Sequence, residues 1–194
     1  MSSLGPDWVR CADGVLYRSA ARVLLFDDED RLLLARGHDA DDPGRSWWFT
    51  IGGGIDPGES PREAAVREVD EETGMRLDPA GLVGPVLRRR ARFDFFAETV
   101  RQDEDFFLAR ADGETTLSRA GWTAIERDFM DELRWWPLGE LSATAAEVFP
   151  HGLPTLAARL ARGWDGTLIH LADDNDDQRP APPGGERRHG PSNG

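Results

Sequence analysis

The first part of the chain contains short apolar runs separated by polar residues, a pattern typical of β-strands. Residues 15–26 and 31–36 are two largely apolar runs separated by four acidic residues, and this arrangement predicts a hairpin. Residues 38–45 are polar and contain proline and glycine, which predicts a loop. Residues 47–51, with the sequence WWFTI, then predict a short strand that leads directly into the glycines at 52–54.

The second half of the chain predicts further strands and helices but no second domain. Residues 82–96 and 99–110 are expected to form two long strands. The other predicted elements are a last strand at 133–136, helices at 138–146 and 154–162, and an extended segment at 164–171. Thus a domain at 15–163 follows an N-terminal segment at 1–14 and precedes a packed extension at 164–171. Residues 172–194 contain no large apolar residue, so we expect a disordered tail.

One helix is bounded by capping signals on both sides. Ser60 can cap the first turn, Pro61 suits the first helical position, and Glu63 completes an S-x-x-E capping box. Gly74 can adopt the left-handed conformation that closes a helix. The sequence therefore predicts a short helix that begins at Ser60 and ends near Thr73.

This helix carries three glutamates on neighbouring rows of one face, Glu68, Glu71 and Glu72. Clustered carboxylates repel one another, so a compensating charge is expected. Mg²⁺ or Mn²⁺ would provide it, because both ions prefer oxygen ligands. The alternative is a solvated acidic face on which Arg67 forms surface ion pairs.

The spacing around this helix favours a metal site. Five residues separate Gly53 from Glu59, and seven more precede Arg67 and Glu68. With the residues that follow as far as Met75, the stretch resembles the Nudix box, G-x5-E-x7-R-E-U-x-E-E-x-G-U, where U is apolar. Every specified position is filled. The residue before the paired glycines, proline in many Nudix proteins, is Ile51 here.

The resemblance implies an α/β/α sandwich with a mixed sheet, and hydrolysis of a diphosphate linkage in a nucleotide derivative with Mg²⁺ or Mn²⁺. It also implies that Arg67 orients the glutamates and that the general base is Glu68 or a glutamate beyond the box. In the polar segment 112–132, the first candidate for that loop glutamate is Glu126 and the second is Glu132, although either could be a surface acid. The implied metal ligands are Glu68, Glu71, Glu72 and the carbonyl of Gly53 or Gly52; the implied catalytic residues are Glu68, Glu71, Arg67 and Glu126; and Gly53, Glu59 and Gly74 support the box.

Two further features are candidates for substrate contacts. Arg88 and Arg90 alternate onto one face of the strand at 82–96 and can bind phosphates in bidentate fashion. The alternative, a solvated face that balances nearby acids, is somewhat favoured. Trp47 or Trp48 can stack on a nucleobase or pack in the core, and core packing is favoured.

Composition narrows the function further. Asp and Glu number 36 against 23 basic residues, a formal charge of -13, which argues against binding to nucleic acid or to anionic membranes. A single cysteine, Cys11, and the lack of a signal sequence predict a cytoplasmic protein. The sequence allows a homodimer. Among substrates, a nucleoside triphosphate is favoured over an ADP-sugar or dinucleotide, and a non-catalytic nucleotide sensor is the alternative function.

Overall fold

The computed structural model describes residues 7–39, 42, 44–95, 98–111, 116–171 and 174–175. The strands are β1 (Val9–Arg10), β2 (Leu16–Phe26), β3 (Leu32–His38), β4 (Ser46–Gly54), β5 (Val83–Phe95), β6 (Glu98–Arg110), β7 (Met130–Trp136), β8 (Glu147–Phe149), β9 (Ile169–His170) and β10 (Asp174–Asn175). The helices are α1 (Pro61–Thr73), the 3₁₀ turn η1 (Pro79–Gly81), α2 (Ala124–Phe129), α3 (Leu138–Ala143) and α4 (Leu153–Leu160).

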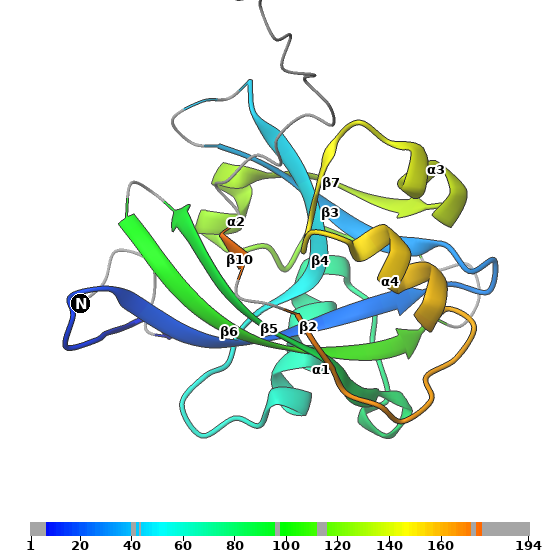
Figure 1. Ribbon diagram of the computed structural model, residues 1–194, viewed down its shortest axis with the longest axis horizontal. Coiled ribbons are helices and arrows are strands. Elements are labelled where there is room, and N and C mark those ends of the chain that lie inside the picture. Colours follow the sequence, from blue (N-terminus) through cyan, green and yellow to red (C-terminus); the bar gives the residue numbers. More distant parts are fainter. Residues whose placement is uncertain are drawn as a thin grey trace, which may run out of the picture.

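Strand β2 lies at the centre of a mixed sheet (Figure 1). It pairs in parallel with β6 from Leu16 opposite Val100 to Phe26 opposite Arg110, and it pairs antiparallel with β3 and β4. The sheet runs in the order β10-β5-β6-β2-β3-β4-β8, while β7 pairs with β3, β9 with β5 and β1 with β2. Because β2 pairs with β4 only near its middle, at residues 20–23, the box glycines lie beside the centre of the sheet.

Two apolar clusters lie on opposite faces of this sheet. Side chains alternate along β2, so that Val23 and Leu25 join the cluster beneath α1, whereas Leu24 and Phe26 join the cluster beneath α3 and α4. Helix α1 contributes Ala64, Ala65 and Val69 to the first cluster; Leu141 of α3 and Leu153, Ala157 and Leu160 of α4 belong to the second. The expected α/β/α sandwich is therefore confirmed.

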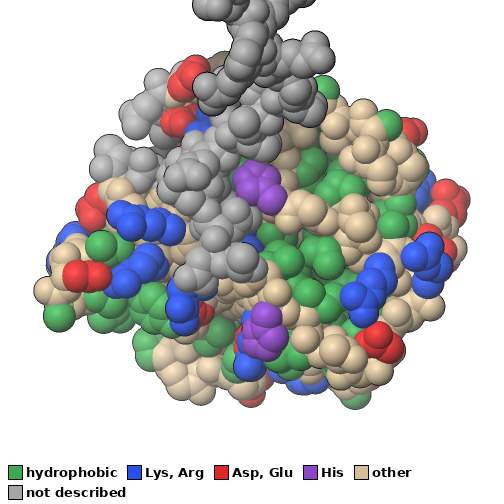
Figure 2. Space-filling model, viewed as in Figure 1, with side chains coloured by type: hydrophobic (Ala, Val, Ile, Leu, Met, Phe, Trp, Pro, Cys, Tyr) green, Lys and Arg blue, Asp and Glu red, His purple; other side chains and the backbone are tan. Residues whose placement is uncertain are grey.

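Apolar side chains are also partly exposed over the second cluster. The face viewed in Figure 1 carries apolar groups near its centre, with charged side chains closer to its edges (Figure 2). Leu156, Trp164 and Ile169 are partly buried against the second cluster. No helix in the described part of the chain is long and apolar enough to cross a membrane.

The predicted elements are largely present, with three corrections. The segment 112–132, expected to be a polar loop, contains α2 and the start of β7, because Thr123 and Glu126 form a capping box. Helix α3 ends at Ala143 rather than at 146, since Thr144 is extended and leads into β8, whose Val148 and Phe149 are buried. Within the predicted disordered tail, β10 pairs with Ala91 and Arg92 of β5; the rest of 172–194 lies outside the described residues.

Candidate active site

Capping fixes both ends of the helix that carries the glutamates. The Ser60 hydroxyl accepts a 3.3 Å hydrogen bond from the Glu63 backbone N–H, and the Glu63 carboxylate accepts a 2.8 Å bond from the N–H of Ser60. At the other end, Gly74 has φ of 74° and donates its N–H to the carbonyl of Asp70. The helix predicted from residues 60–74 is confirmed at both ends.

The end of β4 approaches this helix so closely that a side chain at Gly53 would displace a carboxylate of the helix. A Cβ atom added to Gly53 would lie 2.7 Å from both carboxylate oxygens of Glu68. Gly52 has φ of 127°, a conformation that residues with a side chain rarely adopt, and it donates its N–H to Glu72 Oε2 over 2.9 Å. The paired glycines thus let two carboxylates of α1 approach the end of β4, beside the centre of the sheet.

A third carboxylate, from a later segment of the chain, completes the cluster. Glu68, Glu72 and Glu126 each offer an oxygen, and these three oxygens lie within 4.8 Å of one another. Glu68 and Glu72 are buried, and Glu126 is partly buried. Glu126 is carried by α2, which begins two residues after Trp122. The indole N–H of Trp122 donates a 2.8 Å hydrogen bond to the carbonyl of Glu72. The structure therefore brings Glu126, the first loop candidate, next to the two box glutamates.

Arg67 connects the helix, the preceding loop and β4. Its Nε and Nη2 donate to the two carboxylate oxygens of Glu59, each over 2.9 Å, and Nη2 also donates to the carbonyl of Gly54. Its Nη1 donates to Glu68 at 2.8 Å and to Glu71 at 3.0 Å. These hydrogen bonds raise the pKa of Arg67, with Glu59 as the largest cause, so this guanidinium stays charged.

Burial leaves the negative charge of the cluster poorly compensated. Burial raises the pKa of Glu68 to about 7, and the charges of Glu71 and Glu126 add to this effect, although Arg67 opposes it. Burial also raises the pKa of Glu72 well above its ordinary value, and the neighbouring Glu68 acts in the same direction. Two adjacent carboxyls whose ionisation is disfavoured by burial thus form part of an acidic cluster that could hold a metal ion.

Two acidic candidates lie outside this cluster. The side chain of Glu71 is 43% exposed and pairs with Arg67, so it does not join the group of close carboxylate oxygens that Glu68, Glu72 and Glu126 form. The reason is geometric: Glu68 and Glu72 are four residues apart and stack on one row of the helix, whereas Glu71 lies on the adjacent row. Glu132, the second loop candidate, lies on β7 and pairs with Arg36 at 3.6 Å.

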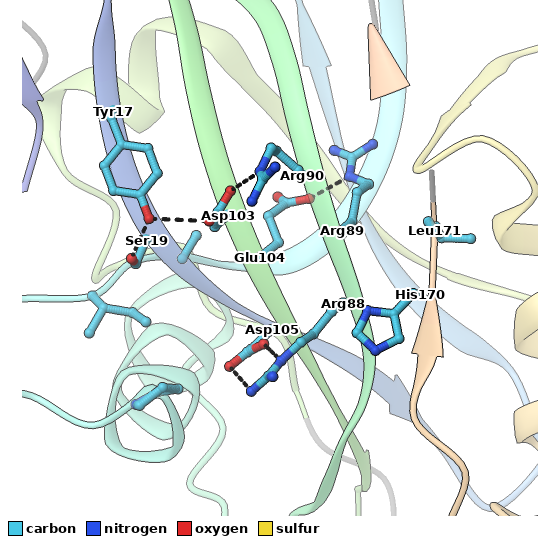
Figure 3. A pocket seen from close by; sticks show the side chains of 13 residues that line it. Tyr17, Ser19, Arg88, Arg89, Arg90, Asp103, Glu104, Asp105, His170 and Leu171 are labelled. Carbon is cyan, nitrogen blue, oxygen red and sulfur yellow. Dashed lines mark hydrogen bonds and ion pairs between the residues drawn. The ribbon is translucent and has the colours of Figure 1, made fainter. Parts of the chain in front are cut away.

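The predicted arginine row is present on β5 but is already paired. Arg88 forms an ion pair with Asp105 at 2.6 Å, and Arg90 forms one with Asp103 at 3.1 Å (Figure 3). Both lie on the exposed face of β5 and line a cavity of about 480 Å³ together with Tyr17. This arrangement agrees with the alternative in which the row balances nearby acids.

Trp48 is unsuited to nucleobase stacking, which corrects that candidate. It is only 6% exposed and packs edge-on against Trp136, with 5.0 Å between ring centroids. Its neighbour Trp47 is partly buried, with Phe149 6.5 Å away and the Arg45 guanidinium above its ring. In a strand, adjacent side chains point to opposite faces, which explains why only one of the two tryptophans is in the core.

One group of residues near the site was missed. Arg22 on β2 donates to the carbonyls of Thr50 and Gly52, and its Nε donates to the buried carboxylate of Glu104. Arg89, the middle residue of an arginine run, also binds Glu104. The available signal was an arginine next to the apolar run at 23–26 of a predicted strand, because a charge at such a position needs a buried partner.

Comparison with known proteins identifies the family. A family model described as the NUDIX domain matches residues 16–156. A protein of Erythrobacter litoralis called RNA pyrophosphohydrolase is 35% identical over 106 residues, which cover 50% of this chain and 63% of that protein. An RNA pyrophosphohydrolase of Saccharophagus degradans is 30% identical over 158 residues, covering 75% of this chain and 88% of that protein.

Solved structures with the same fold include two that cover most of the chain. The MutT protein of Bacillus halodurans matches with a TM-score of 0.54 at 18% identity, and the match covers 78% of this chain and 86% of that protein. The dihydroneopterin triphosphate pyrophosphohydrolase of E. coli matches with a TM-score of 0.50 at 19% identity, and the match covers 74% of this chain and 94% of that protein. With the domain match spanning strands β2 to β8, the box and all three clustered glutamates, the chain belongs to the Nudix family and is a pyrophosphohydrolase, an enzyme that acts on phosphoric anhydrides.

Proposed function

We propose that this chain uses Mg²⁺ or Mn²⁺ to hydrolyse a phosphoanhydride bond in a nucleotide derivative, and that its substrates are molecules that carry a nucleoside 5′-triphosphate group. The observation that carries the proposal is the cluster of Glu68, Glu72 and Glu126, with ligand oxygens within 4.8 Å of one another. Two of its members, Glu68 and Glu72, belong to a Nudix box in which every specified position is filled.

The donor set fits a hard divalent cation. The cluster offers only carboxylate oxygens, the ligand type that Mg²⁺ and Mn²⁺ prefer. The raised pKa values of Glu68 and Glu72 point the same way, since burial, together with repulsion between the carboxylates, favours their protonated forms and an ion would offset both effects. Glu68, Glu72 and Glu126 would hold the cation, and the carbonyl of Gly53 is the backbone candidate.

The roles of the protein groups follow from their contacts. When bound, the cation would neutralise phosphate oxygens and lower the pKa of a coordinated water. Arg67 holds Glu68 by a 2.8 Å ion pair, so it would keep that carboxylate oriented during turnover. Glu68 or Glu126 would accept the proton of the attacking water, because both carboxylates face the cluster.

The substrate class rests on the relatives. The curated relatives from Erythrobacter litoralis and Saccharophagus degradans are called RNA pyrophosphohydrolases, and a Bacillus subtilis protein, 36% identical over 73 residues, is called a putative 8-oxo-dGTP diphosphatase. A terminal 5′-triphosphate on RNA and a free nucleoside triphosphate share the same anhydride chemistry. The names of these relatives point to RNA, whereas the net charge of -13 disfavours contacts along a long RNA backbone. That nucleic acid is not a partner therefore stays a prediction.

The test is release of pyrophosphate or phosphate with Mg²⁺ and then Mn²⁺. The panel should contain nucleoside triphosphates, oxidised nucleotides, a triphosphorylated RNA oligonucleotide, ADP-ribose, ADP-sugars and dinucleoside polyphosphates. Glu72→Gln should remove most turnover, whereas Glu140→Gln, the same change at a side chain 58% exposed on α3, should keep it. Near-normal turnover in Glu72→Gln would refute the metal assignment. Tight binding without turnover across the whole panel would favour the sensor alternative.

A further inference from the structure

A buried carboxylate on β6 holds two arginines from neighbouring strands. Glu104 is 3% exposed and accepts hydrogen bonds from Arg89 Nε at 2.6 Å and from Arg22 Nε at 3.0 Å. The amide of Gln102 donates to the same carboxylate at 2.5 Å. Figure 3 shows Arg89 and Glu104 facing each other across β5 and β6.

Glu104 remains ionised in this environment. Burial alone would raise its pKa, but the charges and hydrogen bonds of Arg89 and Arg22 outweigh that effect and hold the pKa below its ordinary value. Its two oxygens are therefore fixed acceptors, one facing each guanidinium. As a result, Arg22 is held at one end by a rigid ionic contact.

The other end of Arg22 reaches the box glycines. Its Nη1 donates to the carbonyl of Thr50 at 3.2 Å and to the carbonyl of Gly52. Gly52 uses its own N–H to bind Glu72 Oε2 at 2.9 Å. Both polar backbone groups of this one glycine are therefore engaged, the carbonyl by Arg22 and the N–H by a carboxylate of the metal cluster.

We propose that Arg22, held by Glu104, is a positioning residue for the metal carboxylates: by fixing the backbone of Gly52 it keeps the Gly52 N–H aimed at Glu72. The inference rests on the proposed function, in which Glu72 helps to hold the cation. Groups that orient metal ligands without touching the metal are commonly worth about 10- to 100-fold in metal affinity. A charge as buried as that of Arg22, whose side chain is 13% exposed, is costly to keep for stability alone.

Binding of Mn²⁺ to the substrate-free protein tests the proposal without any knowledge of the substrate. Free Mn²⁺ can be followed by electron paramagnetic resonance in titrations of the wild type, Arg22→Gln and Arg22→Lys. We expect Arg22→Gln to weaken binding about 10-fold and Arg22→Lys to recover part of it, because lysine keeps a charged donor but lacks the fork that spans both contacts. Arg31→Gln is the matched control, since Arg31 also pairs with a buried carboxylate, that of Asp27, at 2.6 Å. This control variant should leave Mn²⁺ affinity unchanged.

A double-mutant cycle separates positioning from general stability. If Arg22 acts through Glu72, then Arg22→Gln should change the remaining Mn²⁺ affinity much less in a Glu72→Gln background than in the wild type. Wild-type Mn²⁺ affinity in Arg22→Gln, with a loss of thermal stability like that of Arg31→Gln, would overturn the proposal.

A second variant covers the case in which Arg22→Gln does not fold. Glu104→Gln keeps the shape and an acceptor for Arg22, and should weaken Mn²⁺ binding by a smaller factor. Unchanged affinity in that variant would then overturn the inference. Absence of Mn²⁺ binding by the wild type would overturn both this inference and the proposed metal site, whereas equal binding by the wild type and all Arg22 variants would overturn only the inference.

Discussion

The indole N–H of Trp122 donates a 2.8 Å hydrogen bond to the backbone carbonyl of Glu72. Trp122 is 4% exposed and packs in the same apolar cluster as Val69 of α1. The next residue, Thr123, is the N-cap of α2, the helix that carries Glu126. One side chain thus joins the last turn of the box helix to the segment that supplies the third carboxylate.

Trp122→Phe should therefore weaken both the fold and metal binding. The phenyl ring keeps most of the packing, but the buried carbonyl of Glu72 loses its donor, which costs about 1–3 kcal/mol. Because α2 loses this anchor, Mn²⁺ affinity should fall as well; thermal unfolding and Mn²⁺ titration measure the two effects. Trp164→Phe is the control, since its indole N–H bonds to Thr167 in an exposed segment. Normal Mn²⁺ affinity in Trp122→Phe would mean that Glu126 is positioned by other contacts.

Replacement of Arg67 should damage activity and stability together. Arg67→Ala removes the bidentate contact with Glu59 and the ion pair with Glu68; since hydrogen bonds to charged groups are each worth about 1.5–3 kcal/mol, urea unfolding should detect the loss readily. Turnover should fall at least about 10-fold, the usual cost of losing a group that orients a metal ligand. Arg67→Lys should restore part of the stability but little of the turnover, because an ammonium group cannot form the bidentate fork. Full turnover in Arg67→Lys would contradict an orienting role.

The box helix could be predicted from sequence because its signals are local. Ser60 and Glu63 are three residues apart and form the capping box seen in the structure, and Gly74 takes the left-handed conformation that its position implied. Backbone geometry within one helix depends mainly on neighbours in sequence. The alternation of exposed and buried side chains along β5 is also a local property, and Arg88 and Arg90 are exposed as expected.

Contacts between distant segments could not be predicted in the same way. Helical periodicity placed three glutamates on one face, but which of them would be buried depended on where β4 ends, and only Glu68 and Glu72 meet its glycines. The pairing of Arg22 with Glu104 joins residues 82 positions apart. Such pairs depend on strand order, which no local pattern in this chain specifies.

Gly53→Ala should impair metal binding more than it impairs folding. An added Cβ would lie 2.7 Å from the carboxylate oxygens of Glu68, so that carboxylate must shift and Mn²⁺ affinity should fall by about 10-fold or more, in line with other disturbances of ligand orientation. Gly81→Ala is the matched control, because a Cβ at Gly81 meets nothing within 4 Å. Titration of both variants with Mn²⁺ and thermal unfolding in EDTA provide the comparison. Equal Mn²⁺ affinity in the two variants would show that Glu68 can shift without weakening metal binding.

The metal-free protein should become less stable as the pH rises from about 5 to 7. The folded-state pKa of Glu68 is raised from 4.5 to about 7 by burial, so between these values the folded state binds more protons than the unfolded state, and stability falls by up to about 1.4 kcal/mol per pH unit for one proton. The stabilisation that comes from protonated Glu68 is fully present below pH 4.5 and is lost above pH 7. Glu59 and Glu104 have lowered pKa values, so their contribution has the opposite sign, and it is nearly complete once the pH is well above the ordinary carboxyl pKa of 4.5.

Thermal unfolding in EDTA at several pH values, for the wild type and Glu68→Gln, measures this slope. The variant should show a flatter dependence between pH 5 and 7, because it removes the titrating carboxyl while Glu72 still contributes. Added Mn²⁺ should stabilise the wild type more at pH 8 than at pH 5.5, since protons and the cation compete for the same oxygens. Wild-type stability that is independent of pH across this window, in EDTA and relative to Glu68→Gln, would mean that the cluster is already compensated without a metal ion.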